Sequence, residues 1–377
     1  MDFTKLSVFI DSLESQGIPG CDCAVFSGHK PVFRKMQGHK DSAGKIPVSH
    51  NDIYLLFSIT KVLTCCAIMK LIEEEKIFPD SDVSVYLPAF SEMTVRTSNG
   101  LRPAYKRITI RHLMTMTAGL DYNIQSPSVS DVLNATCGKA STIEIIDAIA
   151  REPLSFEPGT HYQYSLCHDV LAGVIEVVTG MTFSGYLNKI FFEPLEMTNS
   201  FFHPDAAASK RIADFYLYDP KNRISTKTDV FTGFVPSENY DSGGAGLYSS
   251  VDDYIKFASA LACGGISSAG TQLLKRSSID MMRKDQLSGD LRADFDKLSK
   301  KGYSYGLGVR TLTDSNSSKS PVGEFGWDGA AGSYVLIDPD NGISIFYAQH
   351  IMNCSFAFEH IHPTIRDLTY ECMGINK

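Results

Sequence analysis

The stretch Phe57-Ser58-Ile59-Thr60-Lys61 decides how the rest of the chain is interpreted. It opens a segment, 59–76, in which apolar residues recur at helical spacing. Residues three apart on a helix lie on the same face, so the amine of Lys61 can reach the hydroxyl of Ser58. A serine hydroxyl is a weak nucleophile at neutral pH unless a neighbouring group assists it. The stretch therefore predicts an activated serine at a helix start, where the helix dipole favours developing negative charge.

The S-x-x-K pattern also has a simpler interpretation, because it arises by chance in many chains. Ser58 would then be a helix cap and Lys61 a solvated surface residue. The flanking residues, 54–57 before the pattern and 62–63 after it, are apolar. Burial disfavours the charged form of lysine, so we expect a lowered pKa for Lys61, which suits a general base.

Composition excludes several other classes of protein. The chain has 377 residues, enough for one large or two medium domains. Its formal net charge of -8 gives no electrostatic reason to expect a nucleic-acid partner. No run of apolar residues is long enough for a transmembrane helix, so no membrane partner is expected. Leu6, Ile10 and Leu13 recur at helical spacing and predict a docked amphipathic helix, not a signal peptide.

The nine cysteines and the histidines predict neither a disulfide framework nor a metal site. The cysteine count is odd, and no C-x-x-C pair is present. This usage is typical of reduced, buried thiols in a cytoplasmic protein. His360 and His362 are suitably spaced metal ligands on a strand, but no third ligand accompanies them.

Predicted strands lie towards both ends of the chain and predicted helices lie between them. The strand segments are 23–26, 31–33, 303–310, 333–337 and 343–347, and turn-forming residues occupy 27–30 and 338–342. The further helices are 108–117, 168–179 with Gly180 as C-terminal cap, and 251–261. We expect an α+β fold in which an antiparallel sheet, flanked by helices, is formed by about 1–55 and 240–377. A mainly helical lobe of about 56–239 would be inserted, with the site between the lobes.

Two more motifs follow the first one in order. A turn, Pro158-Gly159-Thr160, precedes Tyr164-Ser165-Leu166 at the start of a predicted helix, and 325–332 reads FGWDGAAG before a predicted strand. The segments 110–120 (IRHLMTMTAGL) and 242–247 (SGGAGL) accompany them. With these motifs in this order, nearly the whole chain resembles the serine β-lactamase and penicillin-binding-protein superfamily. The resemblance is strongest to its class C and esterase-like branch.

The resemblance implies a role for each motif residue. Ser58 would form an acyl-enzyme, Lys61 would hold or accept the serine proton, and Tyr164, favoured over Tyr162, would relay a proton to the leaving group. The ordinary pKa of a phenol is near 10, so a tyrosine acts as a base only when it titrates together with a cation such as Lys61. The backbone N–H groups of Ser58 and Ala330 would form the oxyanion hole.

The chain departs from the family pattern at the substrate-binding positions. Leu166 stands where the family often has asparagine, and Trp327-Asp328-Gly329 replaces the common Lys-Thr-Gly. We expect an apolar wall from Trp327 and repulsion of a substrate carboxylate by Asp328. In the alternative, Trp327 packs into the sheet and another cation, Arg310 or Lys319, reaches the site.

The sequence thus predicts a serine hydrolase without metal or organic cofactor. Its substrate would be a small molecule, most simply an uncharged carboxylic ester, and its acyl acceptor could be water or another nucleophile. A peptidase or amidase acting on D-amino-acid compounds and a weak β-lactamase are the enzymatic alternatives. A catalytically silent binding or sensor protein is the non-enzymatic one, and the presence of Ser58, Lys61 and Tyr164 together argues against it.

Overall fold

An antiparallel seven-stranded sheet forms one half of the molecule. The computed structural model describes residues 1–231, 233–298 and 300–375. The strand order is β2-β1-β13-β12-β11-β10-β9, so strands from both ends of the chain pair in the middle of the sheet. Their bounds are β1 Gly20–Ser27, β2 Lys30–Gly38, β9 Tyr303–Tyr305, β10 Arg310–Leu312, β11 Phe325–Asp328, β12 Tyr334–Asp338 and β13 Ile343–Ala348. The expected α+β fold is confirmed.

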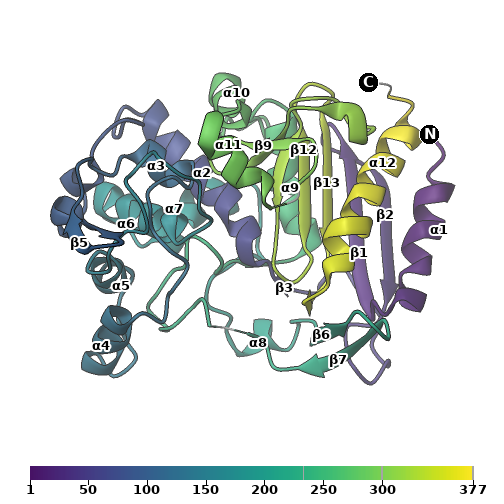
Figure 1. The fold of residues 1–377 in the computed structure, drawn as a ribbon. Helices are drawn as coiled ribbons and strands as arrows, with labels where there is room; N and C mark the ends of the chain where they lie inside the picture. Colours follow the sequence, from purple (N-terminus) through teal and green to yellow (C-terminus); the bar gives the residue numbers. More distant parts are fainter. Residues whose placement is uncertain (232, 299, 376–377) are drawn as a thin grey trace.

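Helices cover both faces of this sheet, so its central strands β12 and β13 are buried on both sides. The helices α1 (Thr4–Ser12) and α12 (His362–Met373) pack against each other on one face, and α9 (Val251–Ala262) packs on the other face (Figure 1). Alternate residues of β12 serve the two faces: Leu336 joins the apolar cluster of α1 and α12, whereas Val335 and Ile337 join the cluster of α9. The period of two in a strand explains this division.

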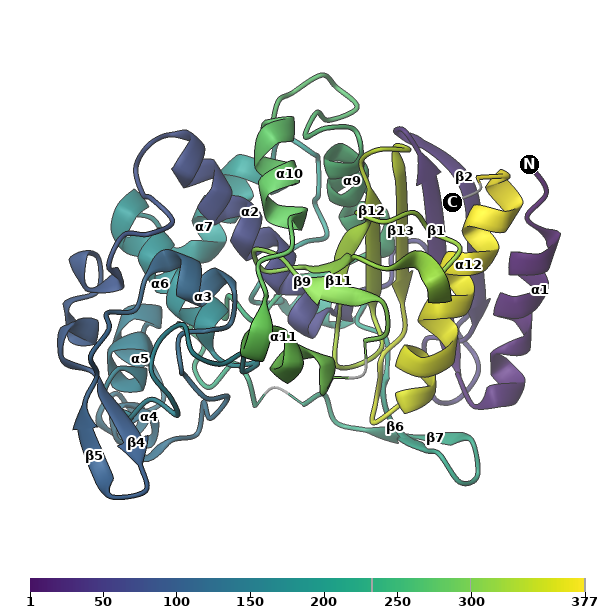
Figure 2. The same cartoon turned by 45° about the horizontal axis from the view of Figure 1, so that its top comes forward.

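The other half of the molecule is mainly helical. There α2 (Thr60–Glu73) packs against α6 (Cys167–Thr179), which also contacts α3, α5 and α7. Figures 1 and 2 show α2 between these helices and the sheet. The remaining helices are α3 Ile110–Met114, α4 Pro127–Ala135, α5 Thr142–Ile149, α7 Phe183–Leu187, α8 Ala206–Ser209, α10 Arg276–Arg283 and α11 Gly289–Asp296. The lobe boundaries near residues 55 and 240 stay a prediction.

Three small sheets complete the fold. The strands β3 (Tyr54–Leu55) and β8 (Tyr248–Ser249) pair next to Ser58, and β4 (Thr94–Thr97) pairs with β5 (Gly100–Pro103). The strand β14 (Ile351–Met352) pairs with β6 (Phe215–Asp219), which pairs with β7 (Ile224–Thr228). Because β14 follows β13 closely, this third sheet lies beside the central sheet.

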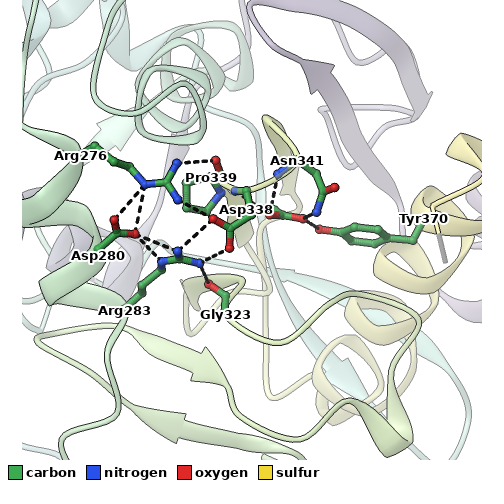
Figure 3. A network of polar contacts seen from close by, with 9 residues as sticks. Arg276, Asp280, Arg283, Gly323, Asp338, Pro339, Asn341 and Tyr370 are labelled. Carbon is green, nitrogen blue, oxygen red and sulfur yellow. Dashed lines mark hydrogen bonds and ion pairs between the residues drawn. The ribbon is translucent and has the colours of Figure 1, made fainter. Parts of the chain in front are cut away.

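The turn predicted at 338–342 is confirmed, and side-chain hydrogen bonds stabilise it. The carboxylate of Asp338 accepts bonds from the backbone N–H groups of Asp340 and Asn341, each at 3.1 Å, and from the Tyr370 hydroxyl at 2.7 Å (Figure 3). Asp340 forms an ion pair of 2.6 Å with Arg283 of α10. The turn therefore ties β12 and β13 to both α12 and α10, as the turn chemistry of aspartate and asparagine allows.

One strand prediction was wrong. The segment 303–310 was expected to form a single strand, but the chain turns at 306–309 and the two arms, β9 and β10, pair as a hairpin. Gly308 has a φ of 79°, and a Cβ there would lie 2.0 Å from the Cys65 sulfur. Only glycine satisfies both the left-handed backbone and the close approach to α2.

The apolar helices are short. Among the described residues, no single helix has the length and hydropathy needed to cross a membrane. The helical segments Cys167–Thr179 and Phe183–Phe192 meet the length and hydropathy criteria only when they are taken together, and the chain bends by 75° between them.

Candidate active site

The candidate nucleophile lies in a tight turn just before α2. Ser58 belongs to a 3-10 turn, Phe57–Ile59, and is 8% exposed. Phe57, the residue before it, has a φ of 49°, which is uncommon for a residue other than glycine. Strained backbone of this kind persists where packing enforces it, commonly at functional sites. Here the phenylalanine ring is buried, and Ser58 keeps only a small part of its surface exposed.

Lys61 is fully buried and contacts the candidate nucleophile. Its Nζ lies 3.3 Å from the Oγ of Ser58 and 3.4 Å from the hydroxyl of Tyr122, and it donates a 2.7 Å hydrogen bond to the Gly244 carbonyl. The same Nζ lies 4.7 Å from the centre of the Tyr164 ring. The structure therefore brings Ser58, Lys61 and Tyr164 together around one amine.

The expected lowering of the Lys61 pKa was wrong. Burial does lower it, but interactions with Tyr122, Tyr164 and the Asp169 carboxylate outweigh burial and raise the pKa above its ordinary value. Lys61 is therefore an ammonium group at neutral pH. Burial raises the pKa of Tyr122 to about 12, although the Lys61 charge opposes the shift. The cation and the phenols therefore titrate as one coupled unit.

Asp169 is the buried counter-charge of this unit. It follows Tyr164 by five residues, lies in the first turn of α6, and accepts 2.7 Å hydrogen bonds from the hydroxyls of Tyr240 and Ser242. A Cβ on Gly244 would lie 2.5 Å from the Asp169 carboxylate and 3.3 Å from Lys61 Nζ, so a side chain at this position would collide with the carboxylate. Sequence reasoning did not single out Asp169; its place within the helix after the Tyr-Ser motif was the available signal.

Three aromatic rings form a stack beside the unit. Tyr164 stacks between Tyr122, at 5.4 Å, and Trp327, at 5.7 Å between ring centres. The indole Nε1 of Trp327 donates a 3.2 Å hydrogen bond to the Tyr164 hydroxyl. Trp327 thus faces the helical part and orients the tyrosine oxygen. Sequence analysis singled out Tyr164 and Trp327, but not Tyr122 as a contact of Lys61.

The turn after β11 lies against the backbone that precedes Ser58. A Cβ on Gly329 would lie 2.2 Å from the Leu56 carbonyl oxygen, and Ser333 Oγ donates a 3.0 Å hydrogen bond to the same oxygen. Ala330 and Ala331 pack in the same apolar cluster as Phe57. This proximity is compatible with an oxyanion hole formed by the N–H groups of Ser58 and Ala330, which stays a proposal.

Asp328 faces away from Ser58, onto the sheet face that α12 covers. Its carboxylate forms ion pairs with Lys300 and, at 3.3 Å, with Arg310, whose side chain is 3% exposed. Burial raises the pKa of Asp328, but the combined effect of Arg310, Lys300 and His362 in lowering it is larger. The pKa of this carboxyl is therefore below its ordinary range. The expected repulsion of a carboxylate by Asp328 was therefore wrong, because two cations neutralise it.

In the alternative for Trp327, this side chain packs into the sheet and Arg310 or Lys319 reaches the site; the structure bears out the packing, also against Tyr305 of β9, but not the two cations. Trp327 is 4% exposed and packs against Tyr164, and the cation near its ring is Lys300, at 5.3 Å, not Arg310 or Lys319. Lys319 pairs with Glu371 of α12. Leu166 is buried at the start of α6 and borders a small void with Leu120 and Asp121, inside the helical part.

Replacing Asp328 with alanine is expected to lower the free energy of unfolding by about 3–5 kcal/mol, because Arg310 would stay buried without its carboxylate. Urea denaturation at pH 7 measures the loss. The matched control is Lys300→Met, which removes a partly exposed cation, keeps the Asp328–Arg310 pair, and should cost about 1 kcal/mol or less. Equal losses in the two variants would show that the Asp328–Arg310 pair is not the stabilising contact.

Comparison with known proteins finds esterases similar to this chain over most of its length. Esterase EstB of Burkholderia gladioli is 27% identical over 364 residues, which cover 90% of this chain and 88% of EstB. The lovastatin esterase of Penicillium rubens is 27% identical over 78% of both chains. A solved structure, EstCE1, described as a hydrolase with promiscuous acyltransferase activity, aligns over 98% of both chains with a TM-score of 0.79 and 23% identity.

The fold and a serine paired with a buried lysine define a serine hydrolase. The chain belongs to the β-lactamase family, whose model matches residues 7–361.

Proposed function

We propose that this protein cleaves small, uncharged carboxylic esters, or transfers their acyl group, through an acyl-enzyme on Ser58. The stack of Tyr122, Tyr164 and Trp327 over the Lys61 ammonium carries the proposal. An indole hydrogen-bonded to Tyr164 occupies the position where the family pattern has a lysine for a substrate carboxylate. The names of EstB and of the lovastatin esterase support an ester substrate.

The residues would act in two half-reactions. Ser58 Oγ attacks the ester carbonyl, and the N–H groups of Ser58 and Ala330 stabilise the oxyanion. The serine proton moves to the Tyr164 oxygen while Tyr164 gives its own hydroxyl proton to the departing alkoxide, which leaves the acyl group on Ser58. The Lys61 ammonium stabilises the negative charge that develops along this relay. Water or an alcohol enters, gives its proton to the same unit, and releases the acid or a new ester while Ser58 regains its proton.

We expect kcat/KM for p-nitrophenyl butyrate to be at least about 100-fold higher than kcat/KM for nitrocefin, when both are measured on the same preparation. A β-lactam presents a carboxylate and an acylamide, and unpaired polar groups in a site cost affinity. The family pattern often has asparagine at position 166, but this chain has Leu166, which offers no amide and is buried in the helical part. Comparable efficiency on nitrocefin would contradict the ester proposal, and faster cleavage of D-alanyl amides would favour the peptidase alternative.

We further propose a cytoplasmic location. All nine cysteines are free, and six of them are buried. Burial raises the pKa of the Cys21 thiol to about 12, which keeps it protonated and unreactive.

Titration of the denatured protein, purified anaerobically without added reductant, is expected to find nine thiols. A parallel sample reduced with phosphine before titration provides the reference. Recovery of five or fewer thiols without reduction would contradict the reducing location.

A further inference from the structure

The glycine segment 242–247, SGGAGL, lies against both α2 and α6 beside Lys61. From α2, the Thr64 hydroxyl donates a 2.6 Å hydrogen bond to the Gly243 carbonyl. From α6, the His168 carbonyl oxygen lies where a Cβ on Gly243 would be only 2.3 Å away. A residue without a side chain allows this close approach. The segment therefore brings its backbone next to the Lys61 amine.

Asp169 of α6 holds this segment in place. Its Oδ1 accepts hydrogen bonds from the hydroxyls of Tyr240 and Ser242, each at 2.7 Å, and from the Gly244 N–H at 3.3 Å. The Ser242 hydroxyl oxygen accepts a further 3.0 Å bond from the Ala245 N–H. One buried carboxylate oxygen thus connects residues along the whole stretch 240–244.

The same segment presents a backbone carbonyl to the amine. Gly244 bonds to Asp169 through its N–H, and its carbonyl accepts a 2.7 Å hydrogen bond from Lys61 Nζ. An ammonium group has three N–H donors. The other oxygens near Nζ belong to Ser58, at 3.3 Å, and Tyr122, at 3.4 Å. The bond to Gly244 therefore orients the remaining donors towards the nucleophile and the phenol.

Asp169 also places a negative charge next to a fully buried ammonium. Burial lowers the pKa of Lys61, whereas Tyr122, Tyr164 and Asp169 together raise it above its ordinary value. A phenol attracts a cation as a full charge only after it has lost its proton, and burial raises the pKa of Tyr122 to about 12. At neutral pH the carboxylate is therefore the charge that opposes the effect of burial on Lys61.

Other titratable side chains of the described residues also lie near this carboxylate and ammonium. Burial raises the pKa of the Tyr240 phenol. It also raises the pKa of the Cys65 and Cys167 thiols and lowers that of the His168 imidazole. Each of these shifts favours the uncharged form of the group. These side chains therefore do not replace the charge of the carboxylate.

We propose that Asp169 is a positioning residue of the hydrolase, which holds the Gly244 carbonyl against Lys61 and keeps Lys61 an ammonium for the proton relay. Asp169 would act through Lys61 and not on the substrate. The inference rests on the proposed function for its ester substrate. Labelling of Ser58 by a fluorophosphonate measures the same relay without any ester.

Asp169→Asn separates the charge from the position, because an amide oxygen can accept the same hydrogen bonds without a negative charge. Without the carboxylate the pKa of Lys61 falls, and the ammonium is lost as the pH rises through this lower value. We expect kcat/KM for p-nitrophenyl butyrate to fall at least about tenfold from pH 7 to pH 9 in this variant, and to stay within about twofold in the wild-type protein. The rate of Ser58 labelling should follow the same two curves.

Asp253→Asn is the matched control. Like Asp169, Asp253 is a buried aspartate in the first turn of a helix, here α9. It accepts a 2.6 Å hydrogen bond from the Asn199 N–H and a 3.2 Å bond from the Ser200 hydroxyl. Its ion pair is with Lys256, so its loss should leave the pH profile of the wild-type protein unchanged. Circular dichroism and urea denaturation at each pH would verify that both variants are folded.

The double variant Tyr240→Phe/Ser242→Ala tests the position while the charge is retained. It removes both hydroxyls that bond to Asp169, and small displacements of a catalytic group are costly. We expect kcat/KM to fall at least about tenfold at every pH, with the shape of the wild-type pH profile. This variant also decides the matter if Asp169→Asn does not fold.

The outcomes separate this inference from the proposed function. A flat profile in folded Asp169→Asn would overturn the role of the charge, and activity that rises with pH in that variant would show that a neutral Lys61 amine is the base. An unchanged kcat/KM in the double variant would overturn the positioning role. If no ester is cleaved but Ser58 labelling still falls with pH in Asp169→Asn, the proposed function fails and the role of Asp169 stands.

Discussion

Replacing Ser58 with alanine is expected to lower kcat/KM for p-nitrophenyl butyrate by about four to six orders of magnitude and to abolish labelling by a fluorophosphonate. Without the hydroxyl no acyl-enzyme forms, and the remaining site can only orient the ester towards water. Intact-mass and peptide mass spectrometry of labelled protein would locate the adduct. We expect it on Ser58 in the wild-type protein, because the Lys61 Nζ lies 3.3 Å from that oxygen.

Ser165→Ala is the matched control for this experiment. Ser165 is also a buried serine and immediately follows Tyr164, but its hydroxyl contacts the Cys167 sulfur at 3.1 Å. This variant should retain activity within about tenfold and keep the adduct. An adduct of the same mass on Ser58→Ala would exclude Ser58 as the nucleophile.

Lys61→Met and Tyr164→Phe are each expected to lower kcat/KM by about three to four orders of magnitude, and the double variant by little more than either single one. The reason is that the ammonium and the phenol move one proton together, so removal of either group disables both. Steady-state kinetics of the four proteins forms a double-mutant cycle. Losses that multiply would show that the two groups act independently.

Tyr162→Phe serves as the control for the tyrosine assignment. Tyr162 is buried two residues before Tyr164, and its hydroxyl has no hydrogen-bond partner among the described residues. Loss of this oxygen should leave kcat/KM within about threefold of the wild-type value. A larger loss in Tyr162→Phe than in Tyr164→Phe would transfer the proton relay to Tyr162. Circular dichroism and urea denaturation of each variant would separate catalytic from folding effects.

Much of the fold was predictable because its determinants are neighbours along the chain. The Gly180 cap has the left-handed φ of 67° that a helix end requires, and α6 ends at Thr179 as expected. The Asp338 turn is stabilised by its own side chain. The spacing of Ser58 and Lys61 places their side chains in contact, since a helical turn determines that distance.

The electrostatics of the site could not be predicted in the same way. The pKa of Lys61 is raised because Tyr122 and Asp169, 61 and 108 residues further along the chain, lie beside it. The charge of Asp328 is neutralised by Arg310 of β10 and by Lys300, which lies in the segment before β9. Sequence spacing carried no sign of either arrangement.

The local sequence thus determined the helix and turn positions, the pairing of Ser58 with Lys61 and the alternation of β12 between two covered faces. The tertiary structure alone decided the protonation of Lys61, the direction of Asp328 and the contact between the rings of Phe57 and Phe215. The physical reason is the range of the forces involved. Caps, turns and helical spacing depend on bonds between residues a few positions apart. The free energy of a buried charge depends on every dipole and charge within several ångströms, whatever its position in the chain.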